Sequence, residues 1–248
     1  MTTALKILAT LGAPSAGSPI LDLHGLDLDG VNFVGDDLQG ADLAGDLLAG
    51  ANLDGANLDW ADLDGANLNG ANLNGARLSH ATLDGAHLHG ARLNDANLSH
   101  ASATNADFIY ATLNGADLAH SNLSYSHAWH AFLIGANLSH ANFFDVNAYS
   151  GHLQHADLND ADFLDGDLSY ADLQRASAKN AQMDNTWLYG TDVKGANFRG
   201  ANLSNAPYGG AKTGGAIDFS DPPRNDTPGT EMTHAHANLC RSNTRLGC

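Results

Sequence analysis

Four histidines recur at every twentieth position, at His80, His100, His120 and His140. Imidazoles held close together could bind zinc or make a surface respond to pH, because histidine titrates near neutral pH and is a common zinc ligand. A straight row, however, is not the tetrahedral cluster that a structural zinc site needs. Ordinary stacking of surface side chains is therefore the first interpretation, a pH-dependent surface the second and a metal site the last.

The C-terminal tail holds a second set of residues that could ligate a metal: His234, His236, Cys240 and Cys248. Their spacing, H-x-H-x3-C-x7-C, matches no familiar zinc site. The two cysteines are the only ones in the chain, and the sequence leaves open whether they form a disulfide or stay as thiols. It predicts no metal site in the tail.

The sequence offers no catalytic motif. It has no Walker loop and no G-x-S-x-G, and the Ser–His neighbours such as Ser79–His80 are the endings of a short repeat. A surface of uniform repeats also offers no enclosed pocket of the kind that small-molecule chemistry favours. The sequence therefore predicts a protein that is not an enzyme and has no cofactor.

Acidic residues dominate the charge. The chain of 248 residues has 28 Asp and Glu against 11 Lys and Arg, a formal net charge of −17. Eleven aspartates and no lysine or arginine lie between Leu21 and Ala76. Direct binding of nucleic acid is not expected, because it needs a basic face. A membrane span is not expected either, because no apolar run approaches the roughly 20 residues that it requires.

Aromatic residues gather in the stretch from Tyr110 to Tyr170, unlike the plain repeats that precede it. Exposed aromatic side chains are good anchors of protein interfaces. The candidate binding residues in this stretch are Tyr110, Trp129, Tyr149 and Tyr170.

The histidine column, the acidic residues up to Ala76 and the aromatic residues named above all lie in a five-residue repeat. It runs from Leu21 to Asn205 without an insertion or a deletion. This stretch makes 37 repeats, and the central residue is Leu in 26 of them. A helix of this period would have no apolar face, and a straight strand would expose every second Leu. The pattern works if the chain turns a corner in each repeat and returns each central residue to a common interior. The frequent Gly after the centre frees the corner, and Asp or Asn before it can hydrogen-bond turn backbone.

The repeats, such as ADLDG ANLNG ANLNG at 61–75, closely resemble the pentapeptide-repeat family. The resemblance implies an all-β fold, a right-handed quadrilateral parallel β-helix with four repeats in each coil. The 37 repeats then make about nine coils stacked at about 4.8 Å. In this fold the four histidines form a ladder, and aspartates form columns on one acidic face. The acidic residues are Asp22, Asp42, Asp62, Asp64 and Asp84.

The central residues are expected to fill the core, including Leu43, Leu63, Leu83, Phe108, Phe143 and Phe163. A coil that loses a central Leu to Ala gains a Phe in three cases: Ala103 with Phe108, Phe143 with Ala148, and Phe163 with Ala178. Such pairs are expected where side chains share a closely packed interior. Ala128 has no such partner in its coil, and the two candidates to compensate are Phe108 of the neighbouring coil and the adjacent Trp129. Asp36 and Asp46 take the normally small inward position, and the sequence gives no reason for them.

The two ends are expected to cover the open coils. Residues 1–20 predict an N-terminal cap with a short helix at 3–11. A weak resemblance to a signal peptide is the alternative, and the helix favours a cytoplasmic protein. Residues 206–248 contain two decayed repeats, a Pro- and Gly-rich connector, and ANLCR at 237–241 as a further cap.

Two hypotheses for function follow. The first is a non-catalytic rod-shaped scaffold that binds another protein, and that could form oligomers through its ends or tail. The second comes from the resemblance, because the quinolone-resistance and toxin-immunity members resemble B-DNA in shape and charge and engage type II topoisomerases such as gyrase. The acidic face fits that second role. Those members typically carry a C-terminal helical segment and some carry projecting loops, and this sequence shows neither.

Overall fold

The computed structural model describes residues 21–213. The predicted cap and helix at 1–20 lie outside the described residues. So do the connector, the segment 237–241 and the tail residues His234, His236, Cys240 and Cys248. No helix in the described part of the chain is long and apolar enough to cross a membrane.

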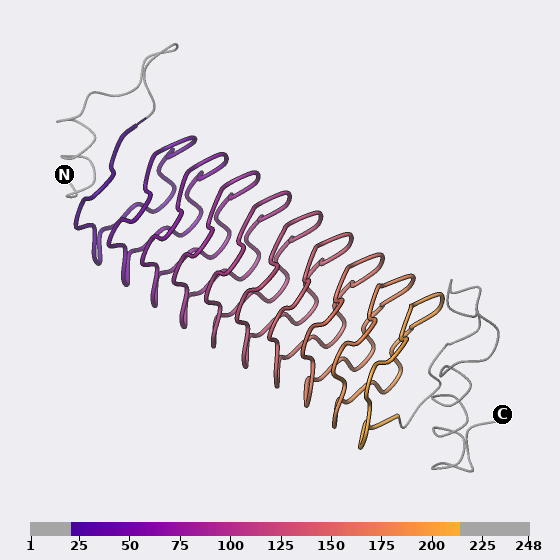
Figure 1. Cartoon of the computed structure of the whole chain (residues 1–248). Helices are drawn as coiled ribbons and strands as arrows, with labels where there is room; N and C mark the ends of the chain where they lie inside the picture. Colours follow the sequence, from indigo (N-terminus) through magenta and orange to yellow (C-terminus); the bar gives the residue numbers. More distant parts are fainter. Residues whose placement is uncertain (1–20, 214–248) are drawn as a thin grey trace.

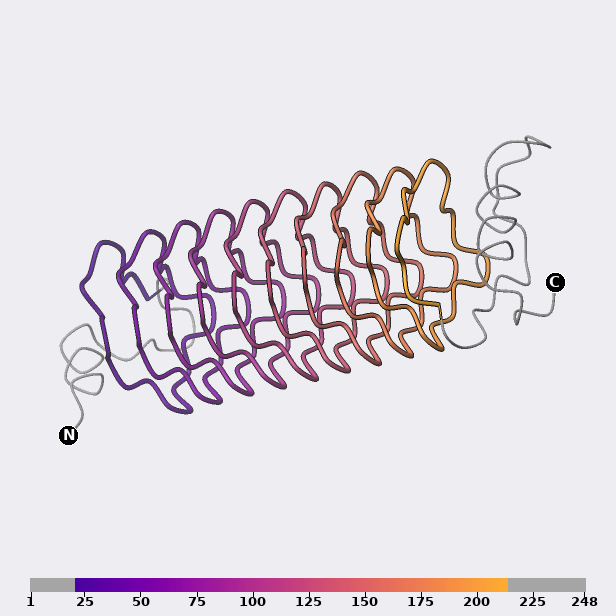
Figure 2. The ribbon, with the colours of Figure 1, turned by 90° about the horizontal axis from the view of Figure 1, so that it is seen from below.

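The described chain is a solenoid whose successive coils lie side by side along one axis (Figures 1 and 2). Parallel β-bridges join residues that are 20 apart, from Asp22 with Asp42 to Asp192 with Lys212. Each coil therefore contains four five-residue repeats. Within residues 21–213 the strand pairing consists of isolated bridges at the residue before the centre of a repeat. Longer strands do not form because the chain turns after every fifth residue.

Each coil has four faces, numbered here by their central residues. Face 1 contains the repeats centred on Leu23 and every twentieth residue after it. Faces 2, 3 and 4 begin in the same way at Leu28, Phe33 and Leu38. The last residue of each repeat is the corner that leads to the next face.

Backbone hydrogen bonds hold the coils together at three points of a repeat. The central N–H donates to the next coil, as from Leu53 to the carbonyl oxygen of Asn72 at 2.7 Å. The corner N–H does the same, as from Gly55 to Asn74 at 2.9 Å. The residue before the centre donates to the previous coil, which completes a parallel ladder. The backbone thus satisfies its own polar groups between coils.

Every corner residue has a left-handed backbone conformation. Positive φ angles occur at every fifth residue from Gly25, with φ of 76°, to Gly210, with φ of 74°. Glycine adopts this conformation without strain because it has no Cβ. The frequent Gly at this position of the repeat is therefore explained by the geometry of the corner.

Aspartate or asparagine before the centre caps the turn that follows. The backbone N–H of Leu164 donates to Oδ1 of Asp162 at 2.9 Å, and that of Asp59 donates to Oδ1 of Asn57 at 3.2 Å. One side-chain oxygen is enough for this bond, and both residue types have it. The fold therefore asks for Asp or Asn at this position and not for a charge.

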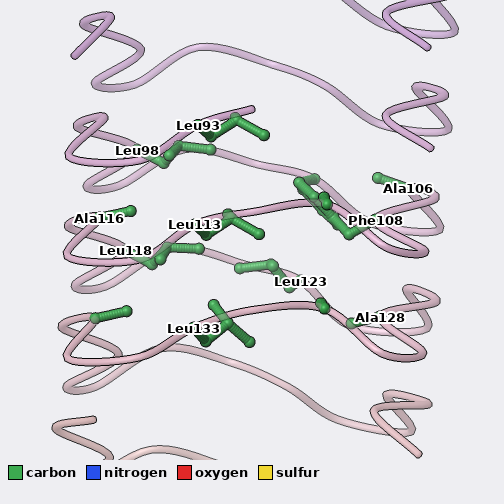
Figure 3. Packing of buried hydrophobic residues seen from close by; sticks show 14 of the residues in the cluster. Leu93, Leu98, Ala106, Phe108, Leu113, Ala116, Leu118, Leu123, Ala128 and Leu133 are labelled. Atoms are coloured by element: carbon green, nitrogen blue, oxygen red, sulfur yellow. The ribbon is translucent and has the colours of Figure 1, made fainter. Parts of the chain in front are cut away.

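The central residues fill the interior. All six expected core residues are buried: Leu43, Leu63, Leu83, Phe108, Phe143 and Phe163. The rings of Phe143 and Phe163 stack in successive coils with centroids 4.8 Å apart. Ala128 is buried one coil beyond Phe108, on the same face (Figure 3). Phe108 is therefore the large central residue next to Ala128 along the axis.

Two inward aspartates mark the first coils. Asp46 is fully buried, and its Oδ1 accepts a hydrogen bond from the backbone N–H of Leu26 at 3.0 Å. Its Oδ2 is buried without a partner. Burial raises the pKa of Asp46 above its usual value, and burial also raises the pKa of Asp36. Asp46 thus ties the backbone of the first coil to the second, at the cost of a poorly solvated carboxyl group.

The two decayed repeats at 206–215 remain part of the solenoid as far as residue 213. The backbone N–H of Leu188 donates to Pro207, and that of Val193 donates to Lys212. Ala206 is buried in the frame position that the repeat predicts. The central residues of these two repeats are Tyr208, which packs against the hydrophobic core, and Thr213, which is buried.

The pairing of large and small centres gives a first prediction, for Ala103 and Phe108. Phe108→Leu should leave a cavity and Ala103→Leu should overpack the coil, each lowering the free energy of unfolding by about 1–3 kcal/mol. The double variant conserves volume and should lose less than about 1.5 kcal/mol. Urea unfolding followed by circular dichroism measures all three. Strictly additive losses would show that the two centres do not share one packing space.

Candidate interaction surfaces

The four histidines stand in a column at the corner after face 4, together with Trp60. We call this set, Trp60, His80, His100, His120 and His140, the imidazole stack. The Trp60 and His80 rings are 4.1 Å apart, and the following ring pairs are 4.9, 4.9 and 4.8 Å apart, with interplanar angles of 8° or less. The structure thus places the four histidines in one continuous column of parallel rings along the rod.

The imidazole stack lies at positions where side chains strain the backbone. Its φ angles run from 57° at His140 to 64° at Trp60. A left-handed conformation costs a residue with a Cβ roughly 1–2 kcal/mol. Each stacked ring pair returns about 0.5–1.5 kcal/mol. Ring stacking therefore offsets much of a cost that glycine at the same corners would not incur.

The same geometry does not suit a shared metal ion. Zinc needs ligands that converge on one point at about 2.0–2.1 Å, whereas parallel rings direct their nitrogens side by side. Among residues 21–213, no group of three or more His, Cys, Asp or Glu residues could hold a metal ion. The stack is therefore a surface of imidazole edges.

The predicted acidic residues lie on face 1 in the first four coils, and we call them the acidic surface: Asp22, Asp42, Asp62, Asp64 and Asp84. Asp42 forms bridges with both Asp22 and Asp62. The Oδ1 atom of Asp64 accepts the backbone N–H of Asp84 at 2.8 Å. These aspartates therefore stand in consecutive coils on one face.

One oxygen of each acidic residue serves the fold. Asp42 Oδ1 accepts the N–H of Ala44 at 3.2 Å, and Asp84 Oδ1 accepts the N–H of Thr104 at 2.8 Å. Asparagine makes both kinds of bond elsewhere: Asn57 accepts the N–H of Asp59 at 3.2 Å, and Asn74 accepts the N–H of Asn94 at 2.9 Å. The negative charge at these positions is therefore separable from the turn cap.

The predicted aromatic residues share face 2 and its corner. The exposed fractions of Tyr110, Trp129, Tyr149 and Tyr170 are 51, 42, 39 and 59%. Trp187 and Tyr189, which the sequence analysis did not single out, continue the same face with 54 and 43%. We call these six residues the aromatic face. Column spacing could have found Tyr189, since it stands in the column of Tyr149, two coils further along.

The rings of the aromatic face support one another. Tyr110 stacks on His130 at 5.1 Å, His130 meets Tyr149 edge-on at 6.4 Å, and Tyr149 lies 5.4 Å from Tyr170. A Cβ on Gly190 would lie 2.8 Å from the Tyr170 ring. The glycine therefore makes room for that ring to lie against the next coil, which limits its freedom.

Comparison with known families finds the repeats directly. The family model described as pentapeptide repeats matches in overlapping stretches from 33–70 to 167–205, which together span 33–205. No curated protein sequence matches the chain.

Solved structures with the same kind of repeat resemble the chain. HetL, a pentapeptide repeat protein involved in heterocyst differentiation regulation from the cyanobacterium Nostoc sp. strain PCC 7120, is 29% identical, with a TM-score of 0.48 over 88% of this chain and 100% of HetL. The full-length plasmid-mediated fluoroquinolone resistance protein QnrB1 is 16% identical, with a TM-score of 0.48 over 88% of this chain and 97% of QnrB1. Rfr23 from the cyanobacterium Cyanothece 51142 is 25% identical, with a TM-score of 0.27 over 41% of this chain and 64% of Rfr23.

Strain at the corners leads to a second prediction, at His100. His100→Gly and His100→Ala both remove the two ring contacts, but only alanine keeps a Cβ in the left-handed conformation. The alanine variant should therefore be less stable than the glycine variant by about 1 kcal/mol, measured by urea unfolding. Gly75→Ala is the matched control, because its Cβ would meet nothing within 4 Å and should cost a similar amount. Equal stability of the two His100 variants would contradict strain at this corner.

Proposed function

The chain belongs to the pentapeptide-repeat family, and on that basis we propose that it is a non-catalytic rod that binds another protein through its aromatic face. Members of this family fold as right-handed β-helix solenoids and are generally structural or interaction proteins. The observation that carries the proposal is the gathering of six exposed aromatic side chains on one face of the rod.

The aromatic face has the character of a prepared interface. Large aromatic rings contribute the most energy per residue when a partner buries them. Here stacking on His130 and contact with Gly190 already restrict several of the rings. A restrained side chain loses less entropy on binding, so more of the contact energy appears as affinity. Faces 1 and 4 carry mostly short polar side chains and offer no comparable set of anchors within residues 21–213.

The finer architecture of the rod is part of the proposal. We infer about nine coils, from 37 repeats at four per coil, capped by residues 1–20 and by the C-terminal tail. Caps at both ends would keep unpaired backbone edges from adding to another chain. The expected N-terminal helix also favours a cytoplasmic protein.

Binding through the aromatic face can be tested by capture of a partner from a lysate of the source cells. The variant Tyr110→Ala, Trp129→Ala, Tyr149→Ala, Tyr170→Ala should retain less than about one tenth of the partner, because interface anchors of this type carry most of the binding energy. The control removes an exposed aromatic side chain at a corner away from the aromatic face, with Trp60→Ala, and should capture the partner normally. Full capture by the fourfold variant would overturn the proposed face.

A second candidate function rests on the acidic surface. The first coils carry eleven aspartates without a lysine or arginine between Leu21 and Ala76. Asparagine makes the same kinds of hydrogen bond elsewhere in the chain, so the fold does not require the charge at the five positions of the acidic surface. A rod with a row of negative charges could occupy the DNA-binding groove of a type II topoisomerase such as gyrase, as an acidic mimic of DNA.

The acidic candidate is tested in a gyrase supercoiling assay with and without a quinolone. Wild-type protein should inhibit gyrase or protect it from the drug. The variant with Asn at all five positions of the acidic surface should fold normally and lose the effect, because asparagine keeps each Oδ1 hydrogen bond and removes the charge. An equal effect of the two proteins would exclude the acidic surface, and no effect of either would exclude the candidate.

A further inference from the structure

The imidazole stack and the acidic surface share one edge of the rod. Asp42 follows the corner residue Gly40 by two positions, and Asp62 follows Trp60 in the same way. Asp22 and Asp42 lie in the two coils before the first histidine. His80 and His100 share the next two coils with the other acidic residues, and His120 and His140 lie in the two coils after those. A column of imidazole rings and columns of carboxyl groups therefore lie side by side at this edge, and they are partly displaced from each other along the rod.

Both sets also have the same pitch. Bridges join Asp22, Asp42 and Asp62 at intervals of one coil, and the imidazole rings follow at 4.8–4.9 Å, which is also one coil. Because the two rows have the same spacing, a row of imidazole rings on one copy can be aligned with a row of aspartates on another copy along its whole length. In an antiparallel pair, the histidines of one copy lie at the level of the aspartates in the neighbouring columns of the other copy: His140 at the level of Asp22, His120 of Asp42, His100 of Asp62 and His80 of Asp84, since each pair of numbers sums to 162 or 164.

A two-fold axis perpendicular to the rod makes all these contacts twice. Contacts of this kind use the same patch on both copies, which is the commonest symmetry of protein dimers. We propose that two copies of this chain pair side by side and antiparallel at mildly acidic pH, with the imidazole stack of each against the acidic surface of the other. This pairing does not involve the aromatic face, so it stands independently of the proposed function.

The pH dependence follows from the two groups. Histidine side chains gain a proton between about pH 8 and 5, and ordinary carboxyl groups keep their charge above about pH 4. Above this window histidine side chains in general carry no charge, and the net charge of −17 separates the copies. Within it, imidazolium groups face carboxylates, and below it the carboxylates lose their charge. Pairing should therefore appear as the pH falls and disappear again in stronger acid.

The other charged side chains beside the imidazole stack do not supply the positive charge that the pairing needs. On the repeats that flank this corner from Asp59 to Asp165 they are Arg77 with its ion-pair partner Asp59, and Asp62, Asp64, Asp84, Asp117, Asp145, Asp157, Asp160, Asp162 and Asp165. Asp117 already accepts hydrogen bonds from Ala119 and Asn137. Between Arg92 and Arg175 the sequence has no lysine or arginine, so histidines are the source of positive charge in the middle coils.

Sedimentation equilibrium of the full chain measures the pairing. The mass should be 25.8 kDa at about pH 7.5 and twice that value at about pH 5.5. At about 1 M salt, where the Debye length is about 3 Å, the dimer should dissociate. A single mass at both pH values would overturn the proposal, and so would growth beyond the dimer that salt does not reverse.

Two histidine variants test whether dimerisation depends on the four histidines of the imidazole stack or only on the number of histidines in the chain. The stack variant is His80→Asn, His100→Asn, His120→Asn and His140→Asn, which the corners accept because Asn105 and Asn180 already have positive φ. It should remain a monomer at about pH 5.5, with a wild-type circular dichroism spectrum. The control variant His87→Asn, His127→Asn, His152→Asn and His155→Asn removes the same number of histidines and should still dimerise. A dimeric stack variant or a monomeric control would overturn the proposal.

Two further measurements test the acidic surface and the possibility that the imidazole stack binds a polyanion and not a second copy of the chain. The variant with Asn at all five acidic positions should also remain a monomer at about pH 5.5. A single-stranded DNA oligonucleotide tests whether the protonated stack binds a polyanion, by fluorescence anisotropy at the same pH. Monomeric wild-type protein that binds the DNA through the four stack histidines would replace the second copy by a polyanion and overturn the pairing.

Discussion

The left-handed corner at every fifth residue is the constraint on which the rest of the structure depends. It turns the chain after each short extended segment, and so it brings every central residue back to the interior. Four such corners close a coil, and bridges then join residues 20 apart. A corner conformation that only glycine adopts freely thus determines the core, the ladder and the shape of the rod together.

The left-handed corners also determine which residues are neighbours on the surface of the rod. Residues 20 apart become neighbours, so a side chain repeated at that interval makes a row, as the imidazole rings do at 4.8–4.9 Å. Rows on a solenoid have the pitch of its backbone, whatever their chemistry. An interaction surface on this fold is therefore built by columns of the sequence, and two rows on different copies of the chain match without any adjustment.

Much of the fold could be predicted from the sequence, because period five has one physical solution in which every centre is buried. The core residues and the histidine column follow from counting. The role of Asp46 does not, since it depends on the backbone N–H of Leu26 one coil away. For Ala128 the sequence named Phe108 and Trp129 as alternatives; Phe108 is its neighbour along the axis in the interior, whereas Trp129 is exposed. The end of the aromatic face was missed because Trp187 and Tyr189 lie among less regular repeats.

The distribution of corner residues indicates where this chain departs from what the fold alone requires. All corners from Gly25 to Gly55 are glycine, whereas between Asp95 and Asn185 only Gly115 and Gly135 are. Strained positions persist where something other than folding keeps them, and they gather at functional sites. All members of the imidazole stack, and Tyr110 and Tyr170 of the aromatic face, are corner residues of this kind. The first coils satisfy the fold with minimal strain, and their distinguishing choice is aspartate where asparagine would serve. The corners of the middle coils carry Asp, Asn, Ser and Arg as well as rings, so strain alone does not mark a surface. The imidazole stack and the aromatic face differ from the other strained corners because their rings contact one another.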